Sequence, residues 1–156
     1  MTETQMPDLS ALTELDGFEQ LQAFFDGRLP RATITDTLGL ENFGGDRGTV
    51  HVELVPGHRH YNPIGSVHGG VLATLLDTAA ACSVHSTLAA GERYTSLDLN
   101  VKFLRAVTVD SGRLRCEGSV LQRGRRTALA EARLYDARRR LVAHATSTCM
   151  IFPVEG

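Results

Sequence analysis

The residues of this sequence best suited to chemistry lie between Gly65 and Asp77. Gly65, Gly69 and Gly70 allow the backbone to turn sharply and allow another group to approach it closely. His68 stands directly before an apolar stretch with helical spacing, and the first N–H groups of a helix have no partner inside it. Together with the helix dipole, these donors suit an anion or a carbonyl oxygen that becomes one. A tight loop in which His68 only packs or caps the helix is the structural alternative.

Asp77 is a carboxylate within a stretch that is otherwise apolar. Helical spacing puts it on a face of small residues, opposite the leucines, which predicts a contact surface for a second helix or a thin ligand chain. The other members of this face are Gly70, Ala73, Thr74, Ala80, Ala81 and Val84. Burial raises the pKa of a carboxyl group unless hydrogen-bond donors hold it ionised.

Oxyanion donors at a helix start and a carboxylate two turns later suit acyl transfer to water. Asp77 would act as general base or nucleophile, and the amide of Gly69 or Gly70 would hold the oxyanion. A thioester is already an activated acyl group, so no Ser–His–Asp triad is required. The alternative is a purely structural Asp77 that is satisfied by a buried partner.

Other chemistries have weaker support. His58, His60 and His68 resemble a metal site, but no further Asp or Cys stands at ligand spacing, so no metal is expected. Cys82 with His85 one turn later suggests a thiol nucleophile. A small buried hydrophobe is the commoner role of such a cysteine. The sequence has no Walker loop, no GxGxxG and no GxSxG elbow.

The elements that must position these residues follow from hydrophobic periodicity. A short amphipathic helix is predicted over 17–29, and a hairpin of two strands over 32–43 and 47–56. The segment 57–67 is predicted to be a loop. We interpret residues 1–30 as a leader with this short helix, and residues 31–156 as the main domain.

A long helix, apolar nearly all round and therefore buried, is predicted from Gly69 to about Ala90. After it, alternation with a period of two predicts four strands, over 94–104, 111–122, 126–136 and 140–152. Strands joined by short turns indicate an α+β fold with an antiparallel sheet. A helix of about 20 residues is roughly 30 Å long, so a sheet wrapped around it is the economical architecture.

Composition sets further bounds. The 156 residues, 42% hydrophobic and 22% charged, suit one globular domain. The first residues lack the basic region and apolar core of a signal peptide, and no apolar stretch is long enough to span a membrane. Three cysteines (Cys82, Cys116 and Cys149) without a CxxC motif predict free thiols in a reducing cytoplasm.

The net charge of −2 hides an uneven distribution, because residues 102–140 hold eleven Lys or Arg and only four Asp or Glu. A basic half suggests a partner that carries phosphate, although solvated strand faces explain it equally well. Nucleic acid is disfavoured, since the arginines form no recognisable nucleic-acid motif.

Four motifs stand in a fixed order: NPIGSVHGG at 62–70 followed by Asp77, then TSLDLNVKFLR at 95–105, QRGRRTALAEARLYD at 122–136 and LVAHATSTCMIF at 141–152. This set resembles the hotdog-fold thioesterases, specifically the phenylacetic-acid-degradation (PaaI-like) branch. The resemblance covers about residues 34–153. It implies the hotdog fold, with an antiparallel sheet wrapped around one long central helix, and hydrolysis of acyl-CoA thioesters without a cofactor, since CoA is part of the substrate.

The resemblance also implies that two subunits pair through their sheets, form the active site at their interface, and often assemble further into a homotetramer. By position, Asn62 would polarise the thioester carbonyl and Gly69 would donate its amide to that oxygen. Asp77 from the partner subunit would activate water or attack directly. Ser96 would orient the water, although strand alternation turns Thr95 inward, so both hydroxyls are candidates. His68 matches the motif and positions the turn.

The resemblance gives the basic half a candidate partner in the phosphates of CoA. Arg123, Arg125 and Arg126 lie on a predicted turn, and Arg105 follows a predicted strand. With Gly65 and Gly70 they form the candidate substrate-binding set. A non-catalytic acyl-CoA-binding protein is the alternative from another class, but binding a neutral acyl group gains nothing from Asp77. A dehydratase of the same fold is the enzymatic rival. No nucleic-acid or membrane partner is expected.

Overall fold

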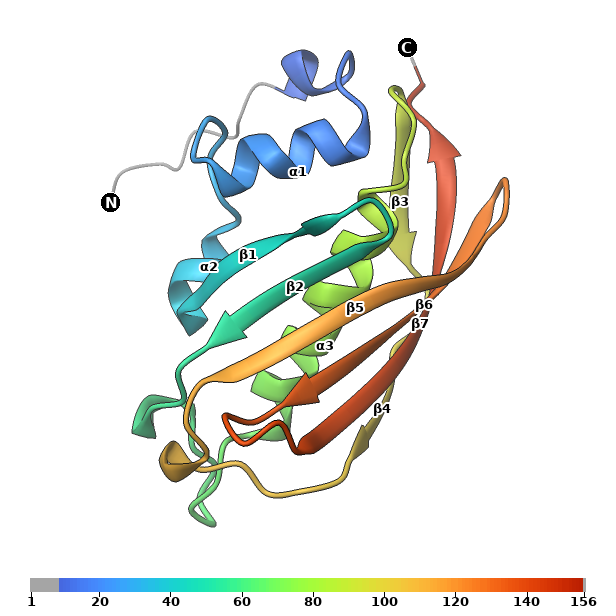
Figure 1. Cartoon of the computed structure of the whole chain (residues 1–156). Coiled ribbons are helices and arrows are strands. Elements are labelled where there is room, and N and C mark those ends of the chain that lie inside the picture. The colour runs from blue at the N-terminus through green and yellow to red at the C-terminus, as the bar shows by residue number, and fades with distance from the viewer. Residues whose placement is uncertain (1–8, 156) are drawn as a thin grey trace.

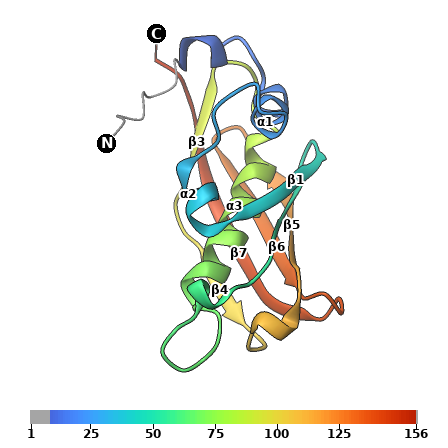
Figure 2. The ribbon, with the colours of Figure 1, turned by 90° about the vertical axis from the view of Figure 1, so that its left-hand side faces the viewer.

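A computed structural model describes residues 9–155. It consists of a curled antiparallel sheet with one long helix, α3 (Gly69–His85), in its concave side (Figures 1 and 2). The sheet order is β1-β2-β5-β6-β7-β3, and β4 also pairs with β7. This is the α+β hotdog fold that the sequence predicts.

The strands are β1 (Leu40–Asp46), β2 (Thr49–Leu54), β3 (Glu92–Ser96), β4 (Asn100–Phe103), β5 (Leu114–Arg123), β6 (Thr127–Tyr135) and β7 (Leu141–Pro153). Besides α3, the helices are α1 (Gly17–Phe25), α2 (Thr33–Leu38) and three single 3-10 turns at Leu9–Leu12, His58–His60 and Val109–Ser111. The short helix predicted over 17–29 is therefore present as α1. The part of the predicted leader before residue 9 lies outside the described residues. None of the helices in the described chain has the length and apolar character that a membrane crossing requires.

The core lies between α3 and the inner face of the sheet. The predicted leucine face of α3 is buried, and Gly118 on β5 allows the helix backbone to approach, since a Cβ there would lie 2.2 Å from the carbonyl oxygen of Ala79. Ala80 and Val84 are also fully buried. The predicted contact surface around Asp77 is therefore narrower than the sequence suggested, because these two residues belong to the core.

The end of α3 comes earlier than predicted, at His85 and not near Ala90. The hydroxyl groups of Ser83, Ser86 and Thr87 donate to carbonyl oxygens three or four residues earlier, at 2.7 Å each. Such local side-chain bonds compete with helix continuation and are typical of helix ends.

The strand predicted over 32–43 is wrong for its first half, which forms a helix. Residues 33–38 form α2, and Gly39 closes this helix in the left-handed region with φ 77°. A glycine in this conformation is a common helix terminator. The strand β1 begins only at Leu40.

The strand predicted over 94–104 is interrupted between β3 and β4. Ser96 pairs with Cys149, and Asn100 pairs with Thr146. The segment between β3 and β4 therefore contains one residue more than the matching part of β7, which is a β-bulge. The carboxylate of Asp98 holds it by accepting from the N–H of Thr148 at 2.8 Å. A bulge reverses which side chains face the helix.

Candidate active site

The first turn of α3 has one unused hydrogen-bond donor. His68 is the N-cap, and its Nδ1 accepts from the N–H of Gly70 at 2.8 Å. The N–H groups of Val71 and Leu72 bond to the carbonyl oxygen of His68 at 2.9 and 3.4 Å. Within residues 9–155, the N–H of Gly69 has no acceptor. Of the two predicted oxyanion donors, the one at Gly69 is therefore available, and the one at Gly70 is engaged by the cap.

The loop before α3 is braced by Asn62. Its Oδ1 accepts from the N–H groups of Ile64 and Ser66 at 3.1 and 3.2 Å, and its Nδ2 donates to Ser66 Oγ at 3.1 Å. Gly65 adopts φ 88°, which favours glycine. A side-chain amide has two protons, so Asn62 keeps one for another acceptor.

Asp77 is half-buried and lies beside Ser96, whose Oγ donates to Oδ1 at 3.4 Å. Burial raises the pKa of Asp77, and the Ser96 hydroxyl opposes this only in part. No ion pair of Asp77 occurs within the described chain. The raised pKa and the spare acceptor capacity of this carboxylate both suit a group that takes up protons.

The structure separates the two hydroxyl candidates. Ser96 faces α3 and also lies 3.9 Å from the Sγ of Cys149. Thr95 pairs with Met150 and is on the outer face. The predicted inward orientation of Thr95 is wrong because the bulge at 97–99 changes the phase of the strand. Leu97, two residues after Thr95, would face inward by the same alternation, yet it is 57% exposed.

The rival nucleophile finds no support in the geometry. Burial raises the pKa of Cys82 to about 12, so its thiol stays protonated at neutral pH. Burial also lowers the pKa of His85 to about 4. Its Nε2 lies 2.8 Å from Oε1 of Gln20, whose own amide donates to two backbone carbonyls. His85 is thus a neutral imidazole that donates from Nε2, and not a base for the thiol.

His60 uses both ring nitrogens within the chain. Its Nδ1 accepts from the N–H of Gly57 at 3.0 Å, and its Nε2 lies 2.8 Å from the carbonyl oxygen of Leu38. No three side chains among the described residues cluster in a way that could hold a metal ion.

The candidate arginines do not lie together. Arg105 borders a hollow at the start of α3 that Gly69 also lines. Arg123 lies at the other end of this helix, where it pairs with Glu92 at 2.8 Å and donates to Thr87 Oγ1 at 3.2 Å. The neighbouring Arg125 and Arg126 are exposed, in the β5–β6 hairpin that extends from the sheet in Figure 1.

Sequence reasoning missed two features of the site. Cys149 lies behind Ser96, which only the strand register reveals. Phe103 was not among the predicted site residues, although its ring lies against Gly69. The available signal was its position two residues before Arg105.

The hotdog fold therefore places a half-buried carboxylate on its central helix and a free N–H at the start of that helix, which are groups that thioester cleavage can use. Residues 64–143, half of the chain, match the thioesterase superfamily. A solved structure from Ralstonia eutropha JMP134, described provisionally as a thioesterase related to phenylacetic acid degradation, is 32% identical. The similarity covers 83% of this chain and 97% of that one, with a TM-score of 0.75.

Two further proteins are similar to this chain. The Escherichia coli PaaI protein from the phenylacetic acid degradation operon has a TM-score of 0.75 at 21% identity, covers 90% of this chain and 94% of its own, and supports the fold alone. A protein of Halobacterium salinarum, named provisionally as an esterase, is 39% identical over 69 residues. That match spans 43% of this chain and 44% of the relative, less than half of its length. The chain belongs to the thioesterase superfamily, and within it to the PaaI-like hotdog proteins.

Proposed function

We propose that this protein hydrolyses acyl-CoA thioesters to the free acid and CoA, in active sites that two copies of the chain build together. The observation that carries the proposal is Asp77, a half-buried carboxylate with one hydroxyl neighbour and a raised pKa. A binding protein for neutral acyl groups would gain nothing from desolvating this group.

The chemistry requires few groups. Asp77 takes a proton from water, whose oxygen bonds to the thioester carbon, or attacks that carbon itself. The N–H of Gly69 stabilises the oxyanion, and the spare amide proton of Asn62 is the candidate second donor. When the C–S bond breaks, the thiolate of CoA leaves and takes up the proton that Asp77 accepted from water. If Asp77 attacks the carbon itself, an acyl anhydride forms as the thiolate leaves, and water then hydrolyses it to the free acid and the carboxylate, while the thiolate takes up the proton from that water. Ser96 holds Asp77, and water beside it, through its hydroxyl.

A second copy of the chain is needed because Gly69 and Asp77 lie far apart along α3. Asp77 follows Gly69 by eight residues on α3, which corresponds to about 12 Å along the axis. Within one chain these two groups are too far apart to act on a single carbonyl. The proposal therefore pairs Gly69 of one copy with Asp77 of the other, and includes the homotetramer as the expected assembly.

CoA is the expected carrier because phosphates suit the exposed arginines. Arg105, Arg125 and Arg126 have no ion pair within the described chain, whereas Arg123 is already bonded to Glu92. We therefore favour the first three for the phosphates of CoA and give Arg123 a supporting role. The cytoplasm stays the expected compartment, on the grounds of the free thiols.

The first test is release of the CoA thiol from aromatic and aliphatic acyl-CoA thioesters by the wild type and by Asp77→Asn. Turnover by the wild type and its loss in a folded variant supports the proposal. If the wild type releases no thiol while acyl-CoA raises its Tm, the non-catalytic binding function replaces it.

Mixing two inactive variants tests the shared site. Asp77→Asn lacks the carboxylate, and Gly69→Pro lacks the free N–H. In hybrids of the two, one of the two shared sites has both groups intact, so activity should reappear after denaturation and refolding of the mixture. Absence of activity in hybrids that are demonstrated by mass spectrometry would mean that each copy works alone.

A further inference from the structure

Gly69 and Gly70 are glycines for different reasons. Gly69 is helical and does not adopt positive φ, so backbone geometry does not require a glycine there. A Cβ at Gly70 would lie 3.0 Å from Nδ1 of His68, its own cap, whereas a Cβ at Gly69 would lie 3.1 Å from Cζ of Phe103. Glycine is the poorest helix former after proline. The ring that lies against position 69 explains why a glycine stands there.

Phe103 is not placed like a core residue. It ends β4, pairs with Ala143 and is on the side of the sheet that faces α3, yet it is 55% exposed. The tip of its ring is directed at Gly69, since Cζ is the atom nearest to a Cβ built there. The ring therefore forms a wall beside the only free N–H of the first helical turn.

This wall borders a hollow of about 270 Å³. Its apolar side chains come from Val67, Leu72, Phe103, Leu104 and Val107, and Ser66 and Arg105 contribute polar groups to the lining. Pockets for whole drug-sized ligands have volumes of about 300–1,000 Å³, and one water takes about 30 Å³. The hollow thus has room for a small acyl group, but not for a complete acyl-CoA.

We propose that Phe103 is a positioning residue of the thioesterase reaction, whose ring holds the thioester carbonyl against the Gly69 N–H and shields that donor from water. The proposal rests on the proposed function, because it needs Gly69 to bind the oxyanion. A donor stabilises developing charge more strongly where water is excluded. Misplacing a bound group by about 1 Å can cost about 100-fold in rate. A ring in contact with Gly69 can therefore change the rate by changing the position of the bound carbonyl.

The first experiment compares Phe103→Ala and Phe103→Leu with Phe152→Ala, a matched removal of a partly exposed ring on β7, at 36% exposure. We expect kcat of Phe103→Ala to fall about 10- to 100-fold, with a smaller change in KM. Phe103→Leu keeps an apolar side chain at this position, so its kcat should lie between those of Phe103→Ala and the wild type. The kcat of Phe152→Ala should match that of the wild type. A merely structural role would lower Tm and leave kcat unchanged.

A double-mutant cycle then tests the contact itself. Gly69→Ala should slow the wild type, because its Cβ displaces the ring, but should cost little more once Phe103→Ala has removed the ring. An equal loss in both backgrounds, or wild-type kcat in Phe103→Ala, overturns the role of the ring and leaves the proposed function standing. Absence of turnover in the wild type overturns both.

Discussion

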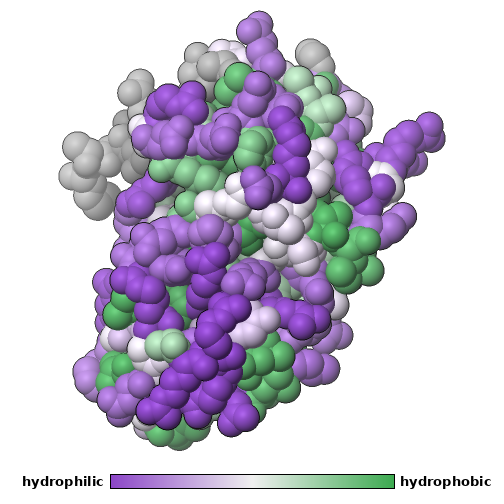
Figure 3. All heavy atoms as spheres, in the orientation of Figure 1, coloured by the Kyte–Doolittle hydropathy of each residue, from purple (hydrophilic) through white to green (hydrophobic). Residues whose placement is uncertain are grey.

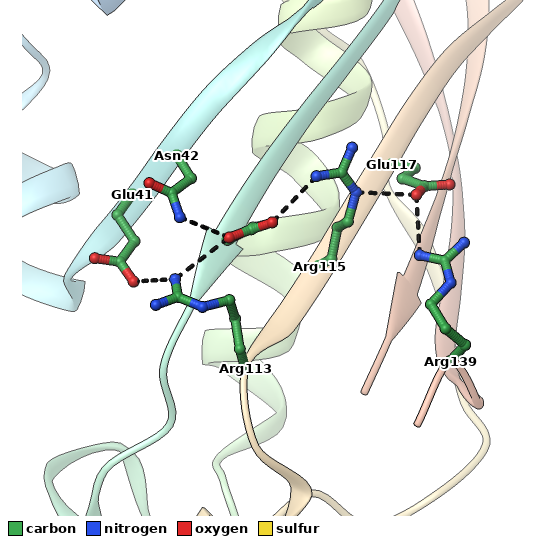
Figure 4. A network of polar contacts seen from close by, with 7 residues as sticks. Glu41, Asn42, Arg113, Arg115, Glu117 and Arg139 are labelled. Carbon is green, nitrogen blue, oxygen red and sulfur yellow. Dashed lines mark hydrogen bonds and ion pairs between the residues drawn. The ribbon is translucent and has the colours of Figure 1, made fainter. Parts of the chain in front are cut away.

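Two carboxylates on opposite sides of the sheet, Glu53 on β2 and Asp77 on α3, have opposite surroundings. On the outer face, Glu53 of β2 accepts from Asn42 at 2.7 Å and from Arg115 at 3.1 Å, within the network of Figure 4. The hydrogen bond of Asn42, and then the arginines, lower its pKa. On the inner side, Asp77 has only the Ser96 hydroxyl at 3.4 Å, and burial raises its pKa.

The same contrast extends from these two residues to the surfaces around them. Seen from outside the sheet, the surface over β1, β2 and β5 is mainly hydrophilic (Figure 3), and its charges occur in pairs such as Arg115 with Glu117 at 3.0 Å. On the inner side, the free N–H of Gly69 and the unpaired Asp77 both have spare bonding capacity. Paired charges hold strands together, whereas spare capacity is what a substrate can use, so charge alone does not mark the site.

The strongest test of this contrast replaces one carboxylate on each face by its amide. Asp77→Asn should lower kcat by a factor of about 10² to 10⁴, the usual contribution of a general acid or base. Glu53→Gln should leave kcat within about twofold, because its surroundings are structural. CoA thiol release measures both. A comparable loss in the two variants would show that the difference in pairing has no functional meaning.

The free amide gives the next largest effect. Proline is well tolerated at the first helical position, and His68 has the extended ψ of 134° that a residue before proline requires. Gly69→Pro therefore removes the N–H and keeps the helix, while Gly69→Ala adds a Cβ and retains the N–H. We expect Gly69→Pro to be about 100- to 1,000-fold slower than Gly69→Ala. Equal rates would remove Gly69 from the chemistry.

Ser96 and Thr95 provide a finer test. Removal of the Ser96 hydroxyl leaves burial of Asp77 unopposed, so Ser96→Ala should raise the pKa of Asp77 further. Since the ionised carboxylate is the active form, the acid limb of kcat/KM should move to higher pH, with about a tenfold loss of rate at neutral pH. Thr95→Ala, on the outer face, should leave the pH profile in place. A shift in Thr95→Ala alone would contradict the assignment.

The sequence was informative where a pattern is local. The leucine face of α3 and the alternation along β5 and β6 follow directly from spacing. The α2 segment was misassigned because its threonines and isoleucine favour strands, and only the left-handed Gly39 distinguishes it.

The rest of the site depends on pairings between distant segments. Asp98 accepts from the N–H of Thr148 and from the hydroxyl of Ser147 on β7, and these bonds hold the bulge next to Ser96. No periodicity within β3 contains that information. The engagement of Gly70 by His68 likewise depends on a side-chain rotamer, not on residue spacing.

The smallest expected effect is on stability, and its sign differs between the two faces. A raised carboxyl pKa in the folded state means that ionisation opposes folding, so Asp77→Asn should raise Tm at pH 7, and this gain should vanish as the pH falls below the ordinary carboxyl range. A lowered pKa has the opposite effect on stability: ionised Glu53 stabilises the fold above that range, and Glu53→Gln should lower Tm at pH 7.

Because both groups are partly solvated, each shift in Tm should be only about 1–2 °C. Thermal unfolding of both variants at pH 7 and pH 4 measures the signs, and a loss of Tm in Asp77→Asn at pH 7 would mean that this carboxylate is held in place for structure.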